Sequence, residues 1–156
     1  MRIIDQKLLD RLTAEASENP RRRKNFNLHQ GDGFCCHRLL NAMEPESYIR
    51  PHRHLDPAKD ESMVMVRGRM GVVVFDEGGN IRNRTVIAAS GDAVAVDIPH
   101  GMFHTVVSLE SGTVFFEAKA GPYLPLSEEE KGVWAPAEGE AEAAGYLAQL
   151  KRLLNG

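Results

Sequence analysis

The sequence lacks the features of several large protein classes. It has two cysteines, adjacent at Cys35 and Cys36, which form neither a disulfide framework nor a CxxC metal motif. No apolar run approaches the length of a membrane span. The N-terminal residues become polar and acidic at once, without the apolar stretch of a secretory signal. We therefore expect a cytoplasmic protein.

The sequence also has little excess of one charge over the other. The 19 basic and 22 acidic residues leave a formal charge of −3, which gives no general attraction to nucleic acid or to an anionic membrane. We expect neither as a partner. A chain of 156 residues suits one compact domain that buries a core without disulfide staples.

Helical patterns occur only near the two ends of the sequence. Apolar residues at helical spacing predict a helix over residues 5–18 and another over residues 139–154. Asp5 is placed to cap the first helix, and Asn19-Pro20 is placed to end it.

The middle of the sequence has a different texture. Between residues 26 and 119, short runs rich in Val, Phe and Leu alternate with Gly, Pro and Asp, which predicts an antiparallel sandwich or barrel. Gly68 is expected to mark a tight bend, and residues 76–80 a hairpin turn. We expect one domain overall, with a helical extension at 1–25, a barrel at 26–123 and a helical extension at 124–156.

Histidines and one glutamate form the pattern that carries chemistry. His52 and His54 are two residues apart, so on a strand both imidazoles lie on one face and can reach a single metal ion. Glu61 follows where the next strand is predicted to begin, and a turn can bring it back toward the pair. His104 follows a Pro-Gly turn at residues 99–101. A single HxH pair is weak evidence, but the joint pattern is much rarer.

This pattern resembles the two paired motifs of the cupin superfamily. The first motif is matched by His52, His54, Glu61 and Gly68, and the second by Gly91, Pro99, Gly101 and His104. Six residues separate His54 from Glu61, which is more than the usual family spacing. The resemblance implies an all-β cupin jelly-roll β-barrel, with an N-terminal and a C-terminal helix added. It also implies a divalent metal on the three histidines and Glu61, and a homodimer.

A longer resemblance is to the WbuC-type cupin-fold metalloproteins. It covers most of the chain, including RRRKNFNLHQ (21–30), RLLNAMEPESYIRPHRH (38–54) and IPHGMFHTVV (98–107). That type is often found near genes for surface polysaccharide synthesis. The resemblance implies a metal-dependent enzyme acting on a small polar metabolite, such as a sugar or a sugar nucleotide.

The donor set leaves the metal and the reaction open. Three imidazoles and one carboxylate suit Fe, Mn, Ni, Co or Zn and leave coordination positions free. Isomerisation, hydrolysis and oxygenation are all compatible with such a site. The alternatives are a non-catalytic metal or metabolite binder, an Fe(II)-dependent dioxygenase, and a barrel that holds no metal.

Strand alternation suggests which residues line the pocket around the metal. The candidates are Tyr48, Arg50, Met63, Met65, His100 and Val106. Some have a plainer interpretation: a surface ion pair for Arg50, core filling for the methionines and an exposed turn for His100. The basic run at 21–24 is either a solvated turn or a mouth that attracts anions. Glu117 and Lys119 share a strand face, where they form an internal pair, a pocket pair or an exposed pair.

Overall fold

The computed structural model describes residues 1–155. Its elements, in chain order, are α1 (Gln6–Glu18), β1 (Arg23–Asn27), β2 (Cys36–Met43), β3 (Glu61–Arg67), β4 (Arg69–Phe75), β5 (Ile81–Ala88), β6 (Ala95–Ile98), β7 (Phe103–Ser108), β8 (Thr113–Ala120), the 3-10 turn η1 (Glu128–Glu130) and α2 (Ala143–Leu154).

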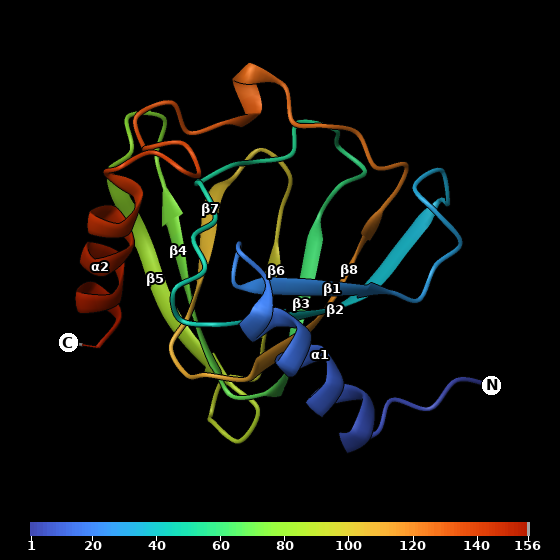
Figure 1. Ribbon diagram of the computed structural model, residues 1–156. Coiled ribbons are helices and arrows are strands. Elements are labelled where there is room, and N and C mark those ends of the chain that lie inside the picture. Colours follow the sequence, from blue (N-terminus) through green and yellow to red (C-terminus); the bar gives the residue numbers. More distant parts are fainter. Residues whose placement is uncertain (156) are drawn as a thin grey trace.

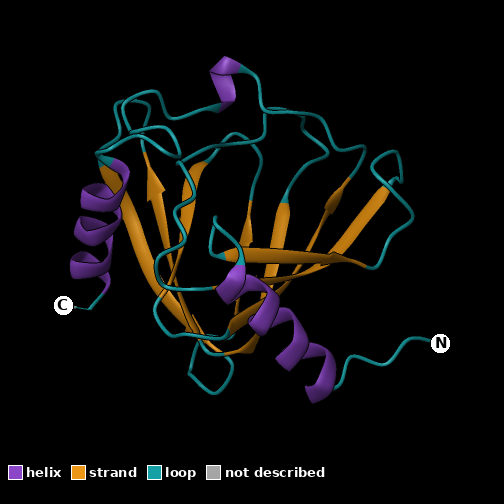
Figure 2. Cartoon of the chain, in the orientation of Figure 1, coloured by secondary structure: helices purple, strands orange, loops and turns teal. Residues whose placement is uncertain are grey.

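The strands form two antiparallel sheets (Figures 1 and 2). One has the order β1-β2-β8-β3-β6 and the other the order β5-β4-β7. A cluster of buried apolar residues with members from both sheets, among them Met43, Met63, Val72, Val106 and Phe115, fills the space between them. This is the jelly-roll architecture expected from the sequence.

The two helices cover the outside of the barrel (Figure 2). The carboxylate of Asp5 accepts a hydrogen bond from the backbone nitrogen of Leu8 at 2.9 Å, so α1 begins with the predicted cap. Its apolar face, with Leu12 fully buried, packs on β1 and β2. The helix ends at Glu18, and the backbone of the following Asn19 is extended, as expected for a residue before proline.

Helix α2 starts later than the sequence pattern suggests. Gly139 adopts a positive φ of 92°, which is incompatible with a right-handed helix, and residues 140–142 form a bend and a turn before Ala143. From Ala143 onward the helix packs Leu147 and Leu150 against the outer face of the three-stranded sheet.

Two predicted turns join consecutive strands of the barrel. Gly68 adopts a φ of +77° between β3 and β4, a left-handed conformation that glycine adopts without steric cost. The predicted hairpin at residues 76–80 joins β4 to β5, and Asp76 accepts hydrogen bonds from Gly78 and Asn80. β3 begins at the end of the barrel where β8 finishes, because the two strands are antiparallel. The candidate site is built at this end.

Across residues 1–155, no helix has the length and apolar character needed to cross a membrane. Cys35 and Cys36 are both exposed and carry free thiols.

Candidate metal centre

Backbone pairing holds His52 beside His104. The backbone nitrogen of each residue donates to the carbonyl oxygen of the other, at 2.9 and 2.8 Å. Residues directly opposite each other in an antiparallel pair point to the same side. The two imidazoles therefore lie together, with ring centroids 4.8 Å apart.

His54 and Glu61 complete the cluster from the same stretch of chain. The rings of His52 and His54 have centroids 5.5 Å apart. His52, His54 and Glu61 each present a ligand atom, and these atoms all lie within 4.8 Å of one another. Glu61 is 2% exposed, and its Oε2 lies 2.9 Å from Nε2 of His104. The structure thus brings together the four residues that the motifs single out.

Backbone carbonyls orient two of the imidazoles. Nδ1 of His52 lies 3.1 Å from the carbonyl oxygen of Arg50, and Nδ1 of His104 lies 2.9 Å from that of Met102. A carbonyl oxygen only accepts, so each Nδ1 carries the proton. Each Nε2 then keeps a free lone pair, as in metal-ligating histidines. Burial, with the nearby His104, lowers the pKa of His52 to about 3, which keeps this imidazole neutral.

Three buried polar atoms at the centre of the cluster have no hydrogen-bond partner among residues 1–155. They are Nε2 of His54, Oε2 of Glu61 and Nε2 of His104. The last two are only 2.9 Å apart, yet they lack the geometry of a hydrogen bond. A buried polar group left unsatisfied costs about 1–3 kcal/mol. A divalent cation would satisfy all three, so the residues present fit a metal.

A lysine holds the other oxygen of Glu61. Nζ of Lys119 lies 2.6 Å from Oε1 of Glu61 and 2.8 Å from Oε1 of Glu117, and Asn41 donates to Oε2 of Glu117 at 2.8 Å. Glu61 and Lys119 meet because they are register partners in the β3–β8 pair. Glu117 and Lys119 therefore form an ion pair on the wall of the pocket, rather than one within the core or one on the outer surface.

The pKa values of the two carboxylates, Glu61 and Glu117, are shifted in opposite directions. Burial by itself would raise the pKa of Glu61, but contacts with His104 and His54 and the charge of Lys119 hold it well below its ordinary value. Burial raises the pKa of Glu117, and Lys119 offsets this only in part. Glu61 is therefore the ionised member, as a metal ligand must be.

A cavity of about 570 Å³ opens beside the cluster. His52, Glu61 and His104 lie on its wall. The rest of the wall is apolar in part, and polar where four asparagines face the cavity: Asn19, Asn25, Asn27 and Asn41. Amides both donate and accept hydrogen bonds, which suits a ligand rich in hydroxyl groups.

Two of the expected pocket residues, Met63 and Val106, line this cavity. Met65 lies deeper, in the buried core between the sheets, and is not on the wall. His100 lies in an exposed turn, where its Nδ1 is 2.9 Å from Asp60. It also stays outside the cavity wall.

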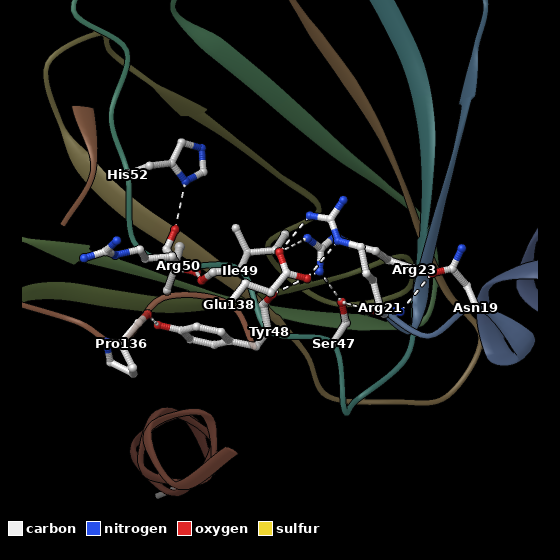
Figure 3. Close-up of polar contacts among 11 residues, drawn as sticks. Asn19, Arg21, Arg23, Ser47, Tyr48, Ile49, Arg50, His52, Pro136 and Glu138 are labelled. Carbon is white, nitrogen blue, oxygen red and sulfur yellow. Dashed lines mark hydrogen bonds and ion pairs between the residues drawn. The ribbon is translucent and has the colours of Figure 1, made fainter. Parts of the chain in front are cut away.

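Tyr48 is turned toward Pro136 of the C-terminal segment instead (Figure 3), and Arg50 contacts Gly132 of the same segment. The Tyr48 hydroxyl donates to the carbonyl of Pro136 at 2.8 Å, and Nε of Arg50 donates to that of Gly132 at 3.0 Å. Neither lines the cavity. Residues 47–50 belong to no strand, so counting alternate residues back from His52 does not give their direction.

The basic run lies at the cavity. Arg21, Arg23 and Lys24 are on its wall. Figure 3 shows the guanidinium groups of both arginines directed at the carboxylate of Glu138: Arg21 donates to both of its oxygens at 2.8 and 2.7 Å, and Arg23 donates to Oε2 at 2.8 Å. One carboxylate thus fixes two guanidinium groups, and the wall keeps a net positive charge there. The run is thus an exposed turn whose side chains also reach the cavity wall, and Lys24 pairs with Glu15 of α1 at 3.3 Å.

Two further histidines, which belong to neither sequence motif, also reach the cavity. His29 and His37 stack with centroids 4.0 Å apart, and both are buried on its wall. On β2, the alternate residues His37, Leu39, Asn41 and Met43 all face the cavity. That period of two is the signal in the sequence that could have identified His37.

The fold resembles that of several solved structures. TT1209 from Thermus thermophilus is 22% identical with a TM-score of 0.54, and the match covers 78% of this chain and 98% of that chain. KdgF from Halomonas sp., a cupin-fold protein, is 14% identical with a TM-score of 0.52, and the match covers 67% of this chain and 83% of KdgF. The conserved protein SPY1581 of unknown function from Streptococcus pyogenes is 13% identical with a TM-score of 0.53, and the match covers 79% of this chain and 90% of SPY1581.

These likenesses show a cupin fold and, at such low identity, the fold alone. No curated protein matches the chain. A family model described as "Domain of unknown function (DUF6016)" matches residues 4–87, more than half of the sequence. The chain is a cupin-fold protein that belongs to the DUF6016 family.

Proposed function

We propose that this chain is a metalloprotein that holds one divalent transition metal through His52, His54, Glu61 and His104, and that it is an enzyme acting on a small polar metabolite. The observation that carries the proposal is that three buried ligand atoms of the cluster, on His54, Glu61 and His104, have no hydrogen-bond partner among residues 1–155. A resident cation accounts for all of them, whereas a metal-free cluster would leave each one unsatisfied. When bound, such a metal supplies a Lewis acid.

The cavity wall supports a sugar or a sugar nucleotide as the metabolite. Its asparagines can pair with hydroxyl groups, and Arg21 and Arg23 can attract a phosphate or carboxylate. Met63 and Val106 present apolar surface beside the cluster. The similarity of the sequence to WbuC-type proteins agrees with this class and with a role in surface polysaccharide synthesis.

Turnover by metal-loaded protein tests the proposal. The protein would be loaded in turn with Fe(II), Mn(II), Co(II), Ni(II) and Zn(II) and incubated with nucleotide sugars, free sugars and keto acids, with products followed by mass spectrometry. We expect turnover with one class, its loss in His104→Ala, and its retention in His100→Ala, since His100 lies outside the cavity wall.

The alternatives give different results in the same experiment. Turnover that requires both Fe(II) and dioxygen would identify a dioxygenase. Binding by calorimetry without any product, across every metal, would favour a non-catalytic binder and contradict the proposed enzyme.

A further inference from the structure

A second, smaller cavity of about 160 Å³ reaches the metal cluster from another side. It shares His52 with the larger cavity, and it adds His54 and Lys59. Among residues 1–155, its wall carries two lysines, Lys59 and Lys119, and no aspartate or glutamate. Glu61 and Glu117 neutralise Lys119 from outside this wall, so Lys59 supplies the excess positive charge of the cavity.

Lys59 is the unneutralised cation of this cavity. The residue is only 8% exposed, and within residues 1–155 no carboxylate lies within ion-pair distance of its Nζ. Its Nζ donates to the carbonyl oxygen of Pro122 at 3.0 Å. Lys119 differs, because Glu61 and Glu117 both pair with it. An ammonium group has three donors and is costly to bury without a counter-charge.

The loop around Lys59 holds this side chain inward. The backbone nitrogen of Lys59 donates to the carbonyl of Asp56 at 2.9 Å, and the Asp56 side chain accepts from the backbone nitrogen of Ala58 at 2.9 Å. This turn is part of residues 55–60, the stretch that makes the spacing between His54 and Glu61 longer than is usual for cupins. The added length thus supplies a buried cation beside the cluster.

We propose that Lys59 forms an anion-binding subsite next to the metal cluster, which takes the carboxylate or phosphate group of the metabolite. The small volume suits a single ionic group, and the remainder of the ligand would extend into the larger cavity across His52. A carboxylate or phosphate oxygen would supply the missing counter-charge to Lys59. The position of this group beside a metal rests on the proposed function, but the anion site itself does not.

Ligand-observed NMR with two probes tests the subsite. Inorganic phosphate and acetate would each be titrated into metal-free and Zn(II)-loaded protein, so that the two arms distinguish a phosphate-binding from a carboxylate-binding site. We expect at least one anion to bind in the millimolar range, and Lys59→Met to weaken it about tenfold or more. Lys59→Arg should keep most of the affinity, and Lys7→Met, on the exposed face of α1, should keep all of it.

The outcomes separate this inference from the metal proposal. Lys59 is not a proposed ligand, so Lys59→Met should keep the metal content and the circular dichroism spectrum of the wild type. Lys59-dependent anion binding to a protein that takes up no metal would support the subsite and contradict the proposed function. The subsite is overturned if neither anion binds the wild type, or if folded Lys59→Met binds both anions unchanged.

Discussion

Replacing Lys119 with methionine should destabilise the metal-free protein strongly. Its Nζ lies 2.6 Å from Glu61 and 2.8 Å from Glu117, and both carboxylates are buried. Removing one partner of a buried ion pair costs about 3–5 kcal/mol, because the other charge stays buried and unpaired. The Lys119 side chain is 21% exposed, so we take the lower end, about 3 kcal/mol.

This free energy converts into a measurable melting temperature. For a chain of this size, each kcal/mol shifts the melting temperature by about 2–4 °C, so Lys119→Met should melt about 6–12 °C below the wild type. A divalent cation on Glu61 would replace the lost positive charge. Saturating Zn(II) should therefore raise the melting temperature of Lys119→Met by more than that of the wild type.

Differential scanning calorimetry of both proteins, with and without Zn(II), makes the comparison. Lys131→Met is the matched control, since Lys131 pairs with the exposed Glu128 and such surface pairs contribute about 1 kcal/mol or less. A Lys119→Met variant that melts with the wild type would refute the reasoning. So would Zn(II) shifts of equal size in the two proteins.

The remaining predictions concern the C-terminal segment. Burial alone would raise the pKa of Glu138, but Arg21 and Arg23 lower it from 4.5 to about 2, so its ion pairs stabilise the fold above pH 4.5 and are lost as the pH falls toward 2. Glu138→Gln should remove this pH dependence, which amounts to about 1 kcal/mol or less in the free energy of unfolding because the group is partly exposed. Melting temperatures measured from pH 5 to pH 2 should therefore fall less steeply in the variant, and an equal fall in both proteins would contradict the role of these pairs. A methyl group on Gly71 would collide with Leu154 of α2, so Gly71→Ala should cost about 1–3 kcal/mol in chemical denaturation. Adding Leu154→Ala should recover part of that loss, and strictly additive effects would contradict the contact.

Spacing in the sequence pointed to His52 and His54 as a pair, and the resemblance to the two cupin motifs added Glu61 and His104. His52 and His54 are two residues apart, and His104 follows a turn that the sequence shows directly. Met63 and Val106, chosen by alternation, lie within regular strands, and both are on the cavity wall.

Other parts of the site depend on contacts that no local pattern encodes. Lys119 reaches Glu61 across 58 positions, through the register of β3 with β8. Glu138 reaches Arg21 across 117 positions, from a segment without regular structure. Tyr48 could not be placed by alternation, because the chain before His52 is not a strand. Long-range packing decides all three.

Metal content is the most direct test of the central claim. Protein made without a histidine tag would be analysed by inductively coupled plasma mass spectrometry, beside His52→Ala, His104→Ala and the control His100→Ala. The account predicts about one transition metal ion per chain in the wild type and in His100→Ala, and a large loss in the other two. A content near zero in the wild type, or one that His52→Ala and His104→Ala leave unchanged, would contradict it.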